Sequence, residues 1–171
     1  MKSLTNFVLE SSNQTGKKYR LTDETTRING KTLYRIEAMK DFSDVKMGDK
    51  GGFIEKEDNL SQEGDCWVYD DAKVYDNAKV YDGGMVTRNA SVYGDAKVYD
   101  EAIIYGDVKI YGNAEIYGIA KVEDEAEVYG NAKIYDEAEV NGNAKVYGNA
   151  VVCGRTEIYG KMKVNNIYIK K

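Results

Sequence analysis

The sequence contains no histidine, no proline and only two cysteines among its 171 residues. Without histidine, the chain lacks the side chain that most often serves as a general base near neutral pH or binds zinc. Without proline, nothing interrupts a long ladder of backbone hydrogen bonds. Cys66 and Cys153 are too few for a disulfide framework and favour a reduced, cytoplasmic setting. We therefore expect continuous β structure with no metal and no cofactor.

A strong charge imbalance and long apolar runs are also missing. The net charge is −5, from 29 acidic and 24 basic residues. This mild acidic excess gives no strong attraction to nucleic acid or anionic lipid. No apolar run is long enough to span a membrane, and the N-terminus lacks the apolar stretch of a secretory signal. The sequence therefore argues against nucleic-acid binding and membrane insertion.

A short repeat is what the sequence has in abundance. From Val68 to Val164 a valine or isoleucine returns every six residues, and a small residue usually follows four places later. A fixed short period of this kind is typical of a solenoid. Because side chains alternate along a strand, the aliphatic residue and the small residue two places before it both point inward. The Asp, Asn and Gly residues between them suit tight corners, since they tolerate a left-handed backbone.

The ends of the chain differ from the repeat. Short β-prone runs flank Asn29-Gly30, and such a pair between two runs is a strong hairpin signal. Near the C-terminus, Met162 and Tyr168 stand where other hexads have a small residue. Natural solenoids cover their open ends. We therefore predict a β-rich cap over residues 1–60, the repeat over 61–163, and a C-terminal plug over 164–171 in which the larger side chains fill the last coil.

Two resemblances make the fold more specific. Hexads such as VYGDAK and IYGNAE resemble the hexapeptide-repeat left-handed parallel β-helix, although tyrosine replaces the usual Gly, Ala or acid at the second position. The segments KYRLTDETTRINGKTLYRIEAMKDF and GGFIEKEDNLSQEGDCWVYDDAKVY resemble the N-terminal signature of a YdcK-like group of bacterial and prophage β-helix proteins, often labelled transferases. The resemblance implies an all-β fold, a single-stranded left-handed parallel β-helix with three hexads per coil.

Stacking of hexads three apart sorts the outward tyrosines into ladders. Adjacent coils lie about 4.8 Å apart, so the rings stack with an offset worth about 0.5–1.5 kcal/mol per pair. Two ladders are unbroken, and the third row is interrupted. The first ladder is Tyr75, Tyr93, Tyr111, Tyr129 and Tyr147, the second is Tyr81, Tyr99, Tyr117 and Tyr135, and the broken row is Tyr69, Thr87, Tyr105, Glu123, Asn141 and Tyr159. The ladders either stabilise the sheets or, for the first ladder, offer an aromatic platform for a ligand.

The broken face carries a second feature, an apolar column formed by Trp67, Met85 and Ile103. An exposed patch of this kind is usually covered. Either the N-terminal cap folds back over it, or another chain covers it. With Tyr69 and Tyr105, the column is our predicted partner-binding or oligomer interface, in a homodimer or homotrimer. Cys66 falls at an inward position and Cys153 at an outward one.

The chemistry of the chain favours binding over catalysis. Acyltransferases on the resembled fold commonly use a histidine base, and carbonic anhydrases on it use histidine zinc ligands. A carboxylate could act as the base, but the corner acids show no distinct pairing. We therefore predict a non-catalytic protein-binding module of phage or prophage origin that binds a host protein, including a defence component. An acyltransferase-like enzyme and a structural or assembly protein remain the alternatives.

Overall fold

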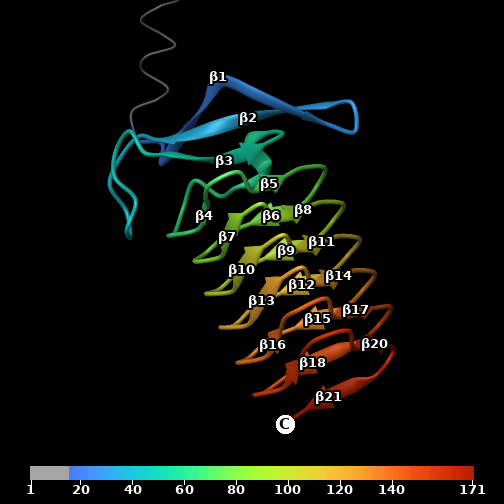
Figure 1. The fold of residues 1–171 in the computed structure, drawn as a ribbon. Coiled ribbons are helices and arrows are strands. Elements are labelled where there is room, and N and C mark those ends of the chain that lie inside the picture. The colour runs from blue at the N-terminus through green and yellow to red at the C-terminus, as the bar shows by residue number, and fades with distance from the viewer. Residues whose placement is uncertain (1–15) are drawn as a thin grey trace, which may run out of the picture.

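The computed structural model describes residues 16–171 as a stack of short strands with an antiparallel hairpin at one end (Figure 1). β1 (Tyr19–Ile28) pairs antiparallel with β2 (Lys31–Ala38) through Asn29 and Gly30, which have φ values of 50° and 80°. The predicted hairpin is confirmed. β3 (Lys50–Ile54) pairs antiparallel with β2 and parallel with β5, so the hairpin continues directly into a solenoid sheet. A single 3₁₀ turn, η1, covers Glu57–Asn59.

Three sheets form the solenoid, and its strands pair in parallel from β3 onward. The nine-stranded first sheet continues from β3 through β5 (Lys73–Val74), β8 (Ser91–Val92), β11 (Lys109–Ile110), β14 (Glu127–Val128), β17 (Lys145–Tyr147) and β20 (Lys163–Asn165). The second sheet contains β4 (Trp67–Val68), β7 (Met85–Arg88), β10 (Ile103–Gly106), β13 (Lys121–Asp124), β16 (Glu139–Val140) and β19 (Glu157–Ile158). The third contains β6 (Lys79–Val80), β9 (Lys97–Val98), β12 (Glu115–Ile116), β15 (Lys133–Ile134), β18 (Val151–Cys153) and β21 (Tyr168–Lys170).

The register follows the repeat. Val74 lies opposite Val92, and Ile110 lies opposite Val128, so each coil contains three hexads. The aliphatic and alanine positions are fully buried along the solenoid axis, and the corner residues adopt positive φ. At Gly112 an added Cβ would lie 2.9 Å from the backbone nitrogen of Gly130, so stacked corners leave no room for a side chain there. The predicted all-β parallel solenoid of triangular coils is confirmed.

The interior corner positions leave room only for small side chains. Ala114 is fully buried beside β12. We expect Ala114→Leu to lower the free energy of unfolding by about 1–3 kcal/mol, because overpacking forces shifts in a closely packed core. Chemical denaturation monitored by circular dichroism measures this change. Asn113→Leu, at an exposed corner next to it, is the control, and an equal loss in both variants would contradict the explanation.

The C-terminal segment extends the sheets. β20 continues the first sheet and β21 the third, with Val151 opposite Tyr168. That step covers 17 residues, whereas the earlier steps cover 18. We predicted that the side chains of Met162 and Tyr168 fill the last coil. They are instead 42% and 59% exposed, so this prediction was wrong.

The N-terminal segment covers the opposite end of the solenoid. Tyr19 and Phe42 pack edge-on against Trp67, with ring centroids 6.1 and 5.3 Å away. Beside them Lys18 is buried, and its Nζ donates to the carbonyl of Cys66 at 2.9 Å and lies 3.1 Å from the Cys66 Sγ. Burial lowers the pKa of Lys18 and raises that of the Cys66 thiol. Within residues 16–171, no helix has the length and apolarity needed to cross a membrane.

Candidate functional site

Two stacked tyrosine ladders follow the first and third sheets. In the first ladder the ring centroids are 4.8–5.1 Å apart, and in the second they are 4.8–4.9 Å apart, with nearly parallel planes. Burial raises the pKa of the Tyr75 and Tyr111 phenols to about 12. The predicted ladders are confirmed, whereas a ligand-binding role for the first ladder stays a prediction.

The hairpin covers the N-terminal end of the first ladder. Tyr75 is only 3% exposed and packs in a small cluster with Leu33 and Phe53. Tyr93, Tyr111, Tyr129 and Tyr147 are half-buried and face outward. An aromatic platform for a ligand would therefore begin at Tyr93, one coil later than the sequence suggested.

The predicted apolar interface is partly hidden. Trp67 lies beneath the N-terminal segment and is 1% exposed, which matches the cap alternative for this residue. Met85 and Ile103 remain half-buried and line a groove together with Ser43 and the exposed Ile119. The partner-binding or oligomer interface therefore stays a prediction for the part that Met85, Ile103, Tyr69 and Tyr105 present.

The sequence placed Cys153 on the surface, and this was wrong. Its side chain is fully buried, and its Sγ lies 3.3 Å from the hydroxyl of Tyr168. The strand β21 lies over it, because the shorter final coil step brings Tyr168 beside β18. Cys66 is buried as predicted, and both cysteines are free thiols.

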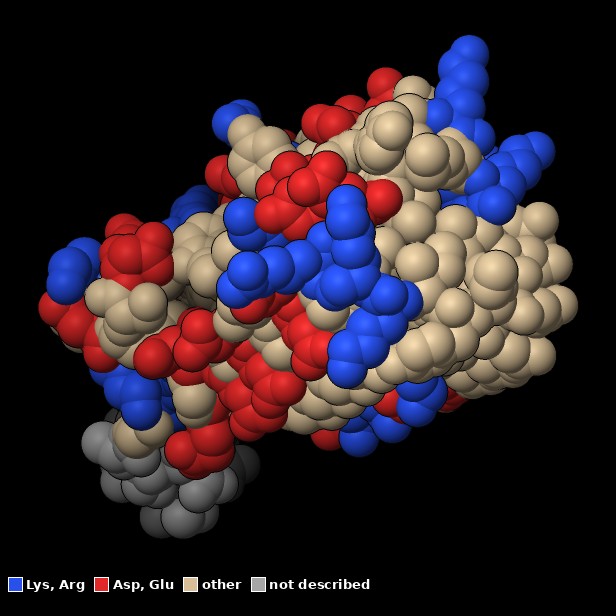
Figure 2. Space-filling view, turned by 90° about the horizontal axis from the view of Figure 1, so that it is seen from below, with Lys and Arg blue, Asp and Glu red and all other residues tan. Residues whose placement is uncertain are grey.

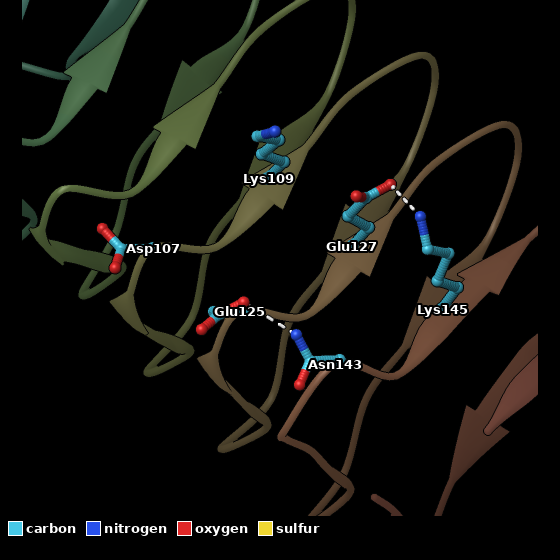
Figure 3. A pocket seen from close by; sticks show the side chains of 6 residues that line it. All are labelled: Asp107, Lys109, Glu125, Glu127, Asn143 and Lys145. Atoms are coloured by element: carbon cyan, nitrogen blue, oxygen red, sulfur yellow. Dashed lines mark hydrogen bonds and ion pairs between the residues drawn. The ribbon is translucent and has the colours of Figure 1, made fainter. Parts of the chain in front are cut away.

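A corner cleft between the second and first sheets brings together charged side chains that the sequence reasoning missed. It has a volume of about 390 Å³ and is lined by two rows, Asp107, Glu125 and Asn143, and Lys109, Glu127 and Lys145. Figure 3 shows the rows side by side on three successive coils. Neighbouring members of each row are 18 residues apart. The same 18-residue spacing that predicted the tyrosine ladders therefore also predicts these two rows.

Within this corner cleft, some groups are paired and others are open to a ligand. Asn143 Nδ2 donates to Glu125 Oε2 at 2.7 Å, and Lys145 Nζ pairs with Glu127 Oε2 at 3.1 Å. Asp107 Oδ1 accepts from Asn89 Nδ2 at 2.9 Å. The Lys109 side chain is exposed, and Figure 3 draws no bond from it to the other five. The cleft can therefore hold an anionic group while offering a carboxylate for proton transfer.

Charged and uncharged side chains occupy different parts of the surface at the C-terminal end. Seen from the C-terminal end, basic side chains gather beside acidic ones, while a broad neighbouring area carries neither (Figure 2). In the described part of the chain, no group of three or more acidic or cysteine side chains is arranged to hold a metal ion.

The fold and repeat define the class of protein. It is a hexapeptide-repeat β-solenoid. It is similar to a protein of Escherichia coli (strain K12) named "Uncharacterized acetyltransferase YdcK", at 40% identity over 62 residues. The match covers 32% of this chain and 19% of that protein, so the chain spans only a small part of its relative. No family model matches the chain.

This likeness corrects our functional prediction. We expected a non-catalytic module that binds a host protein, and we expected no enzyme. A relative named as an acetyltransferase favours the alternative, an acyltransferase-like protein. The absence of histidine misled the interpretation, because a carboxylate can also take a proton in acyl transfer. These findings do not bear on a protein partner, a homodimer or homotrimer, or the cellular location, which stay predictions.

Proposed function

We propose that this chain takes part in acyl transfer from a thioester to an amine or hydroxyl acceptor, with the corner cleft as the reaction site. The observation that carries the proposal is the likeness to a protein named as an acetyltransferase. The cleft supports it because carboxylates and lysines converge there from three coils.

Glu125 is the general base in this proposal. Asn143 donates to its Oε2, which fixes the carboxylate and leaves Oε1 for the acceptor. The acceptor nitrogen or oxygen attacks the thioester carbonyl carbon, and its proton passes to Glu125. The carbon–sulfur bond breaks, and the leaving thiolate takes this proton from Glu125, which restores the carboxylate. A carboxylate fills this part because the chain contains no histidine.

Lys109 binds the donor in this proposal. Its ammonium lies at the rim of the cleft, opposite Asp107 and Glu125 (Figure 3). Acyl-CoA carries phosphate groups, and an ammonium is a common point-charge partner for phosphate. Lys145 is less available, because Glu127 already pairs with it.

The test measures release of free thiol from acetyl-CoA by the pure protein in the presence of a panel of amine and hydroxyl acceptors. We expect Glu125→Gln to lower kcat by about 10²–10⁴-fold, the usual contribution of a general base. We expect Lys109→Gln to raise KM for acetyl-CoA with a smaller change in kcat.

The matched control is Glu115→Gln. Glu115 is likewise a glutamate held by a neighbouring side chain, here by Lys97 and Lys133, but it lies on the third sheet away from the cleft. Its activity should equal that of the unaltered protein. No turnover with any acceptor, or equal turnover in Glu125→Gln, would refute the proposal.

A further inference from the structure

The broken tyrosine row contains a gap the width of one ring. Tyr69, Thr87 and Tyr105 stand on successive coils of the second sheet. On the other two sheets, the ladder tyrosines of successive coils stack with ring centroids 4.8–5.1 Å apart. Tyr69 and Tyr105 are two steps apart, about 9.6 Å at strand spacing, with only a threonine between them. A planar group at this level would meet an aromatic side chain on each side.

The Arg88 guanidinium already stands at this level. Its Cζ lies 5.1 Å from the ring centroid of Tyr105, and its Nε and Nη2 donate to the Tyr105 hydroxyl at 3.1 and 2.8 Å. The guanidinium thus lies over the hydroxyl end of the Tyr105 ring. The side chain is exposed, so it can turn away without disturbing the core.

The backbone at Arg88 is unusual for the molecule. It has a φ of 60°, in the left-handed region. Arg88 is the third residue of its hexad, and from Asp70 to Asn166 every other third residue with positive φ is Asp, Asn or Gly. A bulky residue in this conformation is strained, and such strain gathers at functional sites.

Thr87 adds an unsatisfied polar atom at the same place. Its Oγ1 is buried and has no hydrogen-bond partner in the described part of the chain. Buried hydroxyls are normally bonded, so an unpaired one calls for an explanation. Around it is a recess of about 480 Å³ lined by Asp44, Tyr69, Asp70, Met85, Thr87, Arg88 and Tyr105.

We propose that this recess binds a planar aromatic ring that carries an anionic group. The ring takes the place of the missing ladder tyrosine between Tyr69 and Tyr105, and a polar atom on its edge meets the Thr87 hydroxyl. Arg88 leaves the Tyr105 ring and pairs with the anionic group. Asp44 is engaged by the Tyr69 hydroxyl at 2.7 Å, and Asp70 accepts the Arg88 backbone N–H at 3.1 Å. Both acids are therefore already engaged by hydrogen bonds from the protein, whereas the Arg88 side chain is free to pair with the ligand once it leaves Tyr105. This inference goes beyond acyl transfer and stands without it.

Two ligand sources share this chemistry, a nucleotide and a free aromatic acid. Isothermal titration with adenosine monophosphate and with indole-3-carboxylate distinguishes them. Adenosine and indole supply the ring without the charge, and inorganic phosphate and acetate supply the charge without the ring. We expect at least one charged ring to bind about tenfold more tightly than its neutral counterpart or the anion alone.

Thr87→Tyr is the decisive variant, because it completes the ladder and fills the gap. It should retain the β-sheet circular dichroism and a melting temperature at least as high, yet bind the charged ring about tenfold or more weakly. Arg88→Gln should abolish the preference for the charged ring over the neutral one. Tyr117→Phe, in an intact ladder, should bind as the unaltered protein does. Three outcomes would overturn the inference. The first is unchanged binding in Thr87→Tyr, and the second is phosphate binding as tight as that of the nucleotide. The third is no binding of either charged ring at millimolar concentration.

Discussion

Replacing Ile116 by alanine is expected to lower the free energy of unfolding by about 2–5 kcal/mol. Ile116 is fully buried in β12, with Val98 and Ile134 opposite it on the neighbouring coils. Removal of its outer carbons leaves a cavity that closely stacked coils cannot close, since each coil is fixed by hydrogen bonds on both sides. Urea denaturation monitored by circular dichroism measures the loss.

Ile158→Ala is the matched control for this substitution. Ile158 occupies the equivalent hexad position in β19, which ends the second sheet and, within residues 16–171, pairs only with β16. A solenoid is stabilised mainly by contacts between neighbouring repeats, so a coil with one neighbour loses less and relaxes more easily. We expect a smaller loss than at Ile116. A larger loss at the terminal site would contradict nearest-neighbour stabilisation.

Raising the pH from about 10 to 12 is expected to unfold the protein steeply. Burial raises the pKa of Tyr75, Tyr99 and Tyr111 in the two ladders, whereas phenols of an unfolded chain ionise near pH 10. In this window the unfolded state binds fewer protons than the folded state. The stabilisation is therefore complete below pH 10 and is lost as the pH rises, by about 1.4 kcal/mol per pH unit for each such tyrosine.

Absorbance of the phenolate and circular dichroism, followed together, test this expectation. Ionisation and loss of β structure should coincide in one cooperative step. A variant with Phe at positions 81, 99 and 117 removes three titrating hydroxyls while keeping the rings, so its stability should fall less steeply with pH. Full ionisation of the tyrosines near pH 10 in a protein that stays folded would show that the rings are not protected.

The absence of histidine has a different meaning once the fold is known. The chain lacks the most common general base, but the stacking of coils brings together charged side chains that no short sequence motif contains. Glu125 and Lys109 are 16 residues apart in the chain, and only the coil step brings their rows to one corner. The broken row depends on the same principle, because Thr87 is conspicuous only between Tyr69 and Tyr105. In a solenoid, the residues that make a site therefore lie about one coil apart in sequence.

The sequence by itself determined the solenoid. The six-residue period decides which side chains point inward, and a side chain facing a triangular interior must be aliphatic or small. Three hexads per coil then place Val74 opposite Val92 and stack Tyr93 on Tyr111. These are local rules repeated many times, so they can be deduced without knowledge of distant contacts. The Asn29-Gly30 hairpin belongs to the same group, because its turn depends on two neighbouring residues.

The ends and the irregular places were decided only by the tertiary structure. Nothing near Lys18 in the sequence indicates that its ammonium lies buried against the carbonyl of Cys66, because that contact joins residues 48 positions apart. Cys153 has the alternation of a surface residue, yet the shortened last coil step buries it under β21. Likewise, only packing shows that the Arg88 guanidinium lies over the Tyr105 ring and donates to its hydroxyl. Periodicity describes a coil between two identical neighbours, and each of these residues has a neighbour that breaks the pattern.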